Sequence, residues 1–173
     1  MKPTRPHQTP IVLSVLAVCL LGAAAAAPPA PVTRAYGASQ SAIASTVSVP
    51  SGYTTIYVSG TIPAVVDPKA PAGSTAAYGG GTEAQTEGAL KKIETALAAQ
   101  GAGFGDVVMM HAYLVGVPEA AGRMDFAGMN AAYNRHFGTS QQPNKPARST
   151  VQVAGLAYPG VLVQIEMIAV KKP

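Results

Sequence analysis

The chain has 173 residues, of which 48% are hydrophobic and 12% charged, and its formal net charge is +4. That length suits one domain with a core of its own. The lysine pairs 91–92 and 171–172 are short and lack interleaved aromatic residues, so the charge pattern does not favour a nucleic-acid-binding protein.

The N-terminus has the features of a secretory signal peptide. Lys2 and Arg5 precede an apolar run at residues 11–21, and small alanines suitable for cleavage follow it. A run of about eleven residues is too short to span a bilayer. We therefore expect a signal peptide over residues 1–26 and an exported, periplasmic protein that has no membrane anchor once the signal is cleaved.

Removal of this signal changes what the composition means. Cleavage is expected after Ala25 or Ala26, and it removes Cys19, the only cysteine, so no disulfide can support the mature fold. It leaves 10 of the 12 basic residues against 8 acidic ones, a net charge of about +2. Residues 27–173 then form a single domain, in which the Pro/Ala-rich residues 27–38 are expected to be a mobile leader.

Two strands are predicted next, over Ser39–Val49 and Tyr53–Ser59, because apolar and polar residues alternate there. The following stretch, Pro63–Gly81, is too rich in proline and glycine for regular structure. Its Gly-Gly-Gly run lacks the Lys-Ser/Thr of a phosphate loop. This long segment is either a surface loop without chemistry or a flap over a neighbouring pocket.

A first helix is predicted to begin at Thr82, with Thr82 and Gln85 forming a capping box, and to end at Gly101. A buried central strand follows at Asp106–Val115. A second helix begins near Asp125 and ends before Gly138. Its expected buried stripe contains the residues Phe126, Met129, Tyr133 and Phe137.

The last two strands carry the main candidate site. Pro146–Val153 and Val161–Val170 are both rich in β-branched residues, and they are predicted to pair as a hairpin, with Arg148 opposite Glu166 and Thr150 opposite Gln164. An unpaired carboxylate in an apolar strand is costly, so Glu166 requires a partner or a proton. The Arg148–Glu166 pair is then either a buried ion pair that fixes the strand register or part of a functional site.

The order of elements indicates an α+β fold, a sandwich of one mixed sheet with two helices on one face. The other face of the central strand carries Met109, His111, Tyr113 and Val115, which is too apolar for water alone, so we expect oligomerisation. No His, Cys and carboxylate residues are spaced as metal ligands, and His111 fits a core or interface position better than a ligand position.

Four segments, in this order along the chain, resemble the RidA (YjgF-type) family of imine and enamine deaminases. The resemblance covers about residues 46–170, with an extra stretch after Pro63. The four segments are Val58–Pro63, Asn130–Tyr133, Pro146–Val153 and Gln164–Val170. The resemblance implies a chorismate-mutase-like homotrimer with sites between subunits.

The resemblance also implies residue roles. Arg148 would hold the carboxylate of a small 2-imino acid, Glu166 would activate water, and the main chain around Thr150 would orient the imine nitrogen. Ser59, Gly60 and Asn130 match positions that line the family's substrate site. No cofactor or metal is implied. This chain departs from the family in carrying Thr150 where the enzymes often have cysteine, and in lacking a tyrosine around residues 44–46.

Three functions remain open from the sequence. The first is hydrolytic deamination of reactive 2-imino and enamine acids. The second is a non-catalytic trimeric binder of small carboxylates at subunit interfaces. The third is an interaction or chaperone-like protein whose clefts between subunits are incidental.

Overall fold

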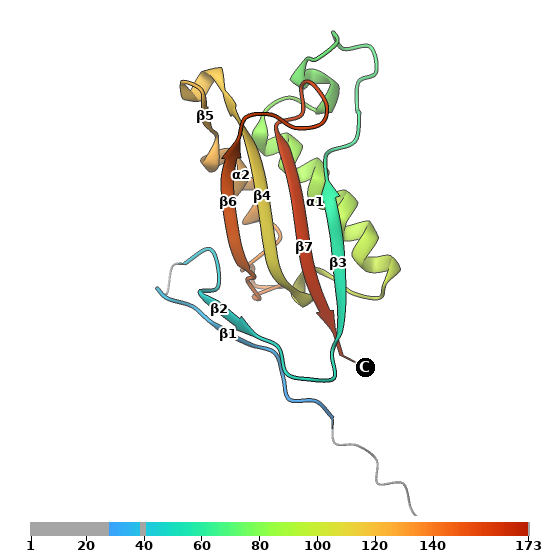
Figure 1. Ribbon diagram of the computed structural model, residues 1–173, viewed down its shortest axis with the longest axis vertical. Coiled ribbons are helices and arrows are strands. Elements are labelled where there is room, and N and C mark those ends of the chain that lie inside the picture. The colour runs from blue at the N-terminus through green and yellow to red at the C-terminus, as the bar shows by residue number, and fades with distance from the viewer. Residues whose placement is uncertain (1–27, 39–40, 173) are drawn as a thin grey trace, which may run out of the picture.

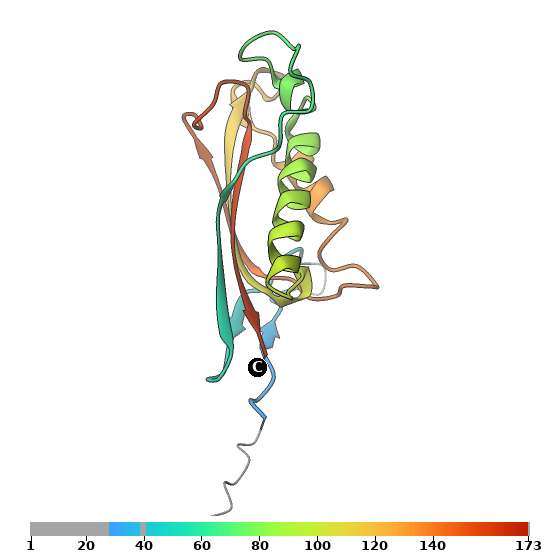
Figure 2. The ribbon, with the colours of Figure 1, turned by 90° about the vertical axis from the view of Figure 1, so that its right-hand side faces the viewer.

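The computed structural model describes residues 28–38 and 41–172, so the expected signal peptide lies outside the described residues. The main body is one β-sheet with both long helices packed on the same face (Figures 1 and 2). This is the α+β arrangement expected from the order of the elements. No helix in the described part of the chain is long and apolar enough to cross a membrane.

The main sheet and its helices take up most of the chain from residue 54 onward. Their bounds are β3 Thr54–Thr61, α1 Thr82–Ala99, β4 Val107–Val117, β5 Arg123–Met124, α2 Phe126–Tyr133, β6 Ala147–Val153 and β7 Val163–Lys171. A small separate pair precedes them, formed by β1 Thr33–Ala35 and β2 Thr46–Ser48. Three short 3-10 helices occupy Thr75–Tyr78, Phe104–Asp106 and Pro118–Ala120.

The N-terminal pair is anchored to the body rather than free. Strand β1 lies within the segment expected to be a leader, and the Arg34 guanidinium donates hydrogen bonds to the carbonyl oxygens of Gly105 and Val107, at 3.1 and 3.2 Å. Within the described part of the strand predicted over residues 39–49, residues 41–49, only Thr46–Ser48 is paired, so the strand is shorter there than expected.

The strand order in the sheet is β3, β7, β4, β6, and β5 pairs with the far end of β4. Strand β7 is antiparallel to both β3 and β4, whereas β6 is parallel to β4. The predicted β6–β7 hairpin is therefore wrong, because β4 lies between the two strands (Figure 1). The connecting residues 154–162 are long enough to cover the roughly 10 Å between strands that are not neighbours.

The predicted register is wrong for the same reason. Arg148 is opposite Met110 of β4, and Glu166 is opposite His111 of β4. Thr150 is opposite Ala112, and Gln164 is opposite Tyr113. Each of these side chains therefore has a β4 residue as its neighbour.

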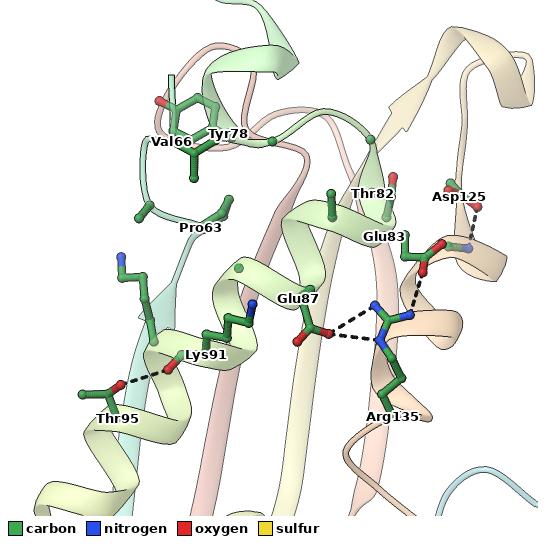
Figure 3. Close-up of a pocket in the computed structure, with 17 residues that line it drawn as sticks. Pro63, Val66, Tyr78, Thr82, Glu83, Glu87, Lys91, Thr95, Asp125 and Arg135 are labelled. Atoms are coloured by element: carbon green, nitrogen blue, oxygen red, sulfur yellow. Dashed lines mark hydrogen bonds and ion pairs between the residues drawn. The ribbon is translucent and has the colours of Figure 1, made fainter. Parts of the chain in front are cut away.

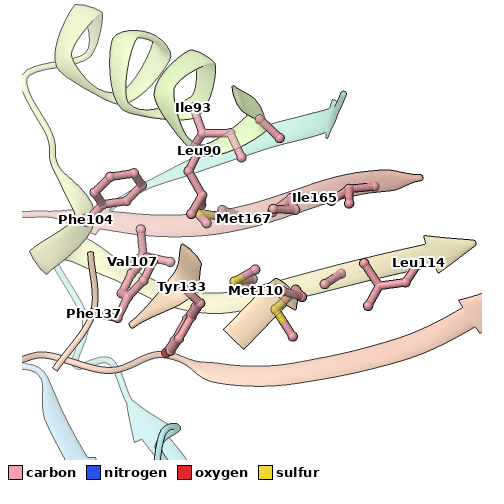
Figure 4. Packing of buried hydrophobic residues seen from close by; sticks show 14 of the residues in the cluster. Leu90, Ile93, Phe104, Val107, Met110, Leu114, Tyr133, Phe137, Ile165 and Met167 are labelled. Carbon is pink, nitrogen blue, oxygen red and sulfur yellow. The ribbon is translucent and has the colours of Figure 1, made fainter. Parts of the chain in front are cut away.

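Alternation along the strands separates a core face from an open face. The core lies between the sheet and the helices, and Figure 4 shows its packing. Its fully buried members include Leu90, Ile93, Leu97, Met110, Leu114, Met129, Tyr133, Ile165 and Met167. None of the helices in the described part of the chain covers the opposite face of the sheet (Figure 2). This face carries Tyr57, which is 77% exposed, and Val151, which is 46% exposed.

Helix α1 starts at Thr82 as predicted, but not with the predicted capping box. Its N-cap is Gly81, which supplies no side-chain hydrogen bond. The Gln85 side chain is fully buried and donates to the carbonyl oxygens of Gly80 and Gly160, at 3.0 and 2.9 Å, while accepting from the amide of Leu162 at 2.8 Å. Gln85 therefore joins two loops to the helix.

Helix α2 begins after Asp125, whose carboxylate accepts a hydrogen bond from the Gly128 amide at 2.8 Å. The helix ends at Tyr133, earlier than the apolar pattern suggested. Phe126 was expected on the buried stripe but is 44% exposed, because it lies in the first turn, at the rim of the core.

Candidate functional site

Arg148 lies on β6, and its side chain extends over the core face beneath α2. Its Nη2 atom donates to Oδ1 of Asn130 at 2.8 Å, and its Nη1 atom lies 3.9 Å from the sulfur of Met129. The guanidinium carbon is 4.3 Å from the centroid of the Tyr133 ring and 5.7 Å from that of Phe126. The guanidinium is therefore held by neutral and aromatic groups.

The charge of Arg148 is not matched by an acid. No carboxylate lies within ion-pair distance of it among the described residues. Burial lowers the pKa of Arg148 from its ordinary value, although an arginine keeps its proton in proteins. A half-buried cation with only neutral partners is a suitable site for an incoming anion.

Tyr133 fixes one side of this site. Its hydroxyl donates to the carbonyl oxygen of Ala42 at 3.1 Å, and burial raises its pKa, so the phenol stays protonated. Its ring stacks on that of Phe137, with centroids 4.6 Å apart. The hydrogen bond of its hydroxyl and the stacking on Phe137 thus fix the position of the Tyr133 ring beneath Arg148.

Thr150 follows Arg148 on the same side of β6. Its hydroxyl is buried and has no hydrogen-bond partner among the described residues. A buried hydroxyl without a partner costs free energy, and a ligand group could satisfy it. Arg148, Asn130 and Thr150 therefore lie on one side of the sheet.

Glu166 lies on the open face. The hydroxyl of Tyr113 donates to its Oε2 atom at 3.3 Å. Desolvation and the charge of Glu166 raise the pKa of Tyr113. His111 is the β4 residue directly opposite Glu166, and Ser149 of β6 is opposite His111. This row of polar residues crosses three neighbouring strands.

A hollow of about 290 Å³ on the open face contains both Glu166 and Ser59. Tyr57, His111 and Ile168 also line it. Gly60 lies in the irregular part of the β3–β7 pairing, and a side chain added there would meet Nε2 of Gln164 at 2.5 Å. Glycine at this position therefore allows Gln164 to approach β3.

The structure thus divides the predicted site residues into two groups. Arg148, Asn130 and Thr150 lie on the helix side, whereas Glu166 and Ser59 lie on the open face. Within one subunit Arg148 and Glu166 cannot contact the same small molecule, because the sheet separates them and β4 lies between their strands.

Some residues of these two groups were missed by sequence analysis. Tyr113 was expected only as part of an apolar face, and Phe126 only as core. The alternation of His111 and Tyr113 along β4 places both on the face of Glu166, but only the pairing with β7 brings them beside it. Within the described residues, no three His, Cys, Asp or Glu side chains cluster closely enough to hold a metal ion.

The fold and these residues define a class of protein, an α+β sandwich with a half-buried arginine on an edge strand beneath the second helix. The model of the family described as Endoribonuclease L-PSP matches residues 39–171, and the chain belongs to this family, which is the RidA/YjgF family predicted from its motifs. A RutC family protein of Pyrococcus abyssi is 35% identical over 117 residues, covering 68% of this chain and 79% of that protein. A RutC family protein of Haemophilus influenzae is 52% identical over 48 residues, covering 28% of this chain and 36% of its own.

Solved structures agree with this assignment. A putative endoribonuclease of Thermotoga maritima has 30% sequence identity and a TM-score of 0.52, covering 78% of this chain and 91% of that one. The Rid family protein YyfB of Yersinia pestis has 22% identity and a TM-score of 0.55, covering 74% of this chain and 86% of that one. At this identity the likeness supports the fold and nothing further. E. coli TdcF, solved with bound serine, has 28% identity and a TM-score of 0.50, with coverage of 69% and 86%.

Proposed function

We propose that this protein binds small 2-imino or enamine acids through Arg148 and hydrolyses them. Water adds to the imine carbon, the C–N bond breaks, and the products are a 2-oxo acid and ammonia. The observation that carries the proposal is the half-buried guanidinium of Arg148, which has neutral partners in Asn130 and Tyr133. The similar protein TdcF was solved with serine, a small molecule that also carries a carboxylate.

Arg148 is well placed to orient such a substrate. An arginine binds a carboxylate through two parallel hydrogen bonds, and its planar fork restricts the angle of approach. Asn130 and the Tyr133 ring fix the guanidinium before a ligand arrives, which lowers the entropy cost of binding. The unpartnered hydroxyl of Thr150 offers one more hydrogen bond to the bound molecule.

Glu166 is the proposed general base, and a base in this role contributes typically about 10² to 10⁴-fold in rate. Because Glu166 and Arg148 of one subunit lie on opposite faces, we propose that a complete site combines Arg148 of one copy with Glu166 of another. The apolar open face around Tyr57 and Val151 supports assembly of copies, and a homotrimer is the state proposed.

A second candidate is a carboxylate binder without turnover. The separation of Arg148 from Glu166 favours it, because Arg148, Asn130 and Thr150 already form a binding site without the glutamate. The family description also names an endoribonuclease, but the short lysine pairs of this chain do not favour RNA as the substrate.

The two candidates are separated by measuring ammonia release from imines that an amino-acid oxidase generates in situ. Wild type is compared with Arg148→Gln and Glu166→Gln, and binding of a stable 2-oxo acid is followed by calorimetry. Arg123→Gln and Glu94→Gln, which change exposed residues on β5 and α1, are the matched controls.

A deaminase accelerates ammonia release in the wild type and both controls, and loses that acceleration in both site variants. A binder binds the 2-oxo acid, loses binding only in Arg148→Gln, and never accelerates release. If neither effect occurs, both candidates fail and an interaction protein remains. Export of the protein would place either function outside the cytoplasm, and fractionation of producing cells tests that location.

A further inference from the structure

A second cavity lies on the helix side of the molecule, apart from Arg148. It is a groove of about 890 Å³ between the loop after β3, the outer side of α1 and the start of α2 (Figure 3). We call it the α1 groove. Among the residues that line it are Pro63, Val66, Tyr78, Glu87, Lys91 and Arg135. Arg148 and Glu166 are not among those that line it.

The loop wall of the α1 groove is apolar and ordered. The Val66 amide donates to the carbonyl oxygen of Ala77 at 2.8 Å, which closes the loop upon itself. Pro63 is buried, and Val66 is 65% exposed and lines the groove together with Tyr78 (Figure 3). The long segment of residues 63–81 therefore forms one wall of a pocket.

Small residues of α1 form the bottom of the groove and leave space above the helix. A Cβ added at Gly88 would lie 3.1 Å from Cβ of Pro63, so glycine allows the chain to cross close to the helix. Ala84 lies one turn before Gly88 and also lines the groove. Small side chains at these two positions leave room between the loop and the α2 side.

The α2 side of the groove is charged and carries a small ion-pair network. Arg135 donates to Glu83 at 2.6 Å and to Glu87 at 3.2 Å, and Nε2 of His136 lies 3.1 Å from Glu87. Asp125, at the same side, caps α2 through the Gly128 amide. Glu83 and Glu87 therefore share the guanidinium of Arg135, and an anionic ligand group is expected to bind away from this side.

The two lysines of the groove differ from this wall. Nζ of Lys92 donates to the carbonyl oxygen of Ile62 at 2.9 Å, and no carboxylate in the described part of the chain lies within ion-pair distance of Lys91 or Lys92. The groove thus combines an apolar wall with two lysines that form no ion pair among the described residues.

We propose that the α1 groove binds a small amphipathic anion, an aromatic or branched aliphatic molecule with one carboxylate or sulfonate. Its apolar body packs on Pro63, Val66 and Tyr78, and its anionic group binds Lys91. The volume is within the range of about 300 to 1,000 Å³ that small-molecule sites occupy, and such sites combine apolar walls with few polar groups. This site is independent of the proposed deaminase chemistry.

The test uses 8-anilinonaphthalene-1-sulfonate, an aromatic sulfonate, titrated into the mature protein by calorimetry and fluorescence. We expect one saturable site per chain. Lys91→Gln should bind about tenfold more weakly because it loses the charged contact, and Val66→Asp should also bind about tenfold more weakly because it replaces an apolar contact by a carboxylate that repels the sulfonate. The uncharged analogue N-phenyl-1-naphthylamine should also bind more weakly than the sulfonate.

Two neighbouring residues provide matched controls. Val65 is exposed, as Val66 is, and Lys69 lies in the same loop. Neither Val65 nor Lys69 lines the groove. Val65→Asp and Lys69→Gln should bind the sulfonate as the wild type does. The proposal is overturned if binding survives Val66→Asp and Lys91→Gln, if the controls lose binding equally, or if no saturable binding is found.

Discussion

The Nη2 atom of Arg148 on the edge strand β6 donates a hydrogen bond to the side-chain oxygen of Asn130 on α2, at 2.8 Å. This bond joins the strand to the helix that covers it. Because asparagine is neutral, it orients the guanidinium without cancelling its charge. The positive charge therefore remains available to an anion from outside the chain.

Asn130→Asp should convert this relationship into an ion pair. The new carboxylate would neutralise Arg148 and compete with a ligand carboxylate, so 2-oxo acid affinity should fall by about tenfold or more. The thermal midpoint should not decrease, because the hydrogen bond is kept and gains charge. Calorimetry and a melting curve on the same sample check both statements, and unchanged affinity would show that ligands do not bind at Arg148.

Tyr133→Phe should separate stability from binding. The change removes the hydroxyl that donates to Ala42 but keeps the ring under Arg148. We expect a loss of about 1 kcal/mol in the free energy of unfolding, with 2-oxo acid affinity unchanged. Urea denaturation measures the first quantity and calorimetry the second. A large loss of affinity would mean that the phenol itself contacts the ligand.

Gln85→Ala should be one of the more damaging polar substitutions. It removes three hydrogen bonds of a fully buried side chain and leaves Leu162, Gly80 and Gly160 without their partner. The expected cost is about 2 to 4 kcal/mol of unfolding free energy. Gln141→Ala, at an exposed position, is the control and should stay near wild type. Equal stability of the two variants would show that Gln85 does not join the loops to α1.

Glu87→Gln should change the dependence of stability on pH. Although burial raises the pKa of Glu87, the hydrogen bonds and charges of His136 and Arg135 outweigh it and hold the pKa below its ordinary value of 4.5. A group whose pKa is lowered by folding stabilises the protein above its unfolded-state pKa, and that contribution disappears as the pH falls through the folded-state pKa.

The expected loss in Glu87→Gln is therefore about 1 to 2 kcal/mol at neutral pH. The difference from wild type should shrink as the pH is lowered from about 4.5. Urea denaturation at a series of pH values measures it. If the difference in unfolding free energy between wild type and Glu87→Gln stayed constant down to the acid transition, His136 and Arg135 would not stabilise the ionised carboxylate.

Val151→Glu should disrupt assembly through the open face. It places a carboxylate at a 46% exposed position among apolar residues of that face. We expect a lower oligomeric mass by light scattering, loss of any imine hydrolysis that needs Glu166 of another copy, and retained carboxylate binding at Arg148. Val65→Glu, which changes an exposed residue of the loop after β3, is the control. An unchanged mass would argue against the open face as the interface.

Much of the fold could be predicted from the sequence. The apolar alternation along β4 and β7 and the 3.6-residue spacing of Leu90, Ile93 and Leu97 depend on neighbours close in the chain, so they are visible without coordinates. The same holds for the start of α1 at Thr82 and for the motifs that identified the family.

The tertiary structure alone decided which strands are neighbours. Every strand offers the same backbone donors and acceptors, so the local pattern shows which side chains share a face but not which strand lies beside another. The short connection between β6 and β7 suggested a hairpin, yet β4 pairs with both. Arg148 and Glu166 consequently lie on opposite faces, and the sequence by itself determined their presence but not their separation.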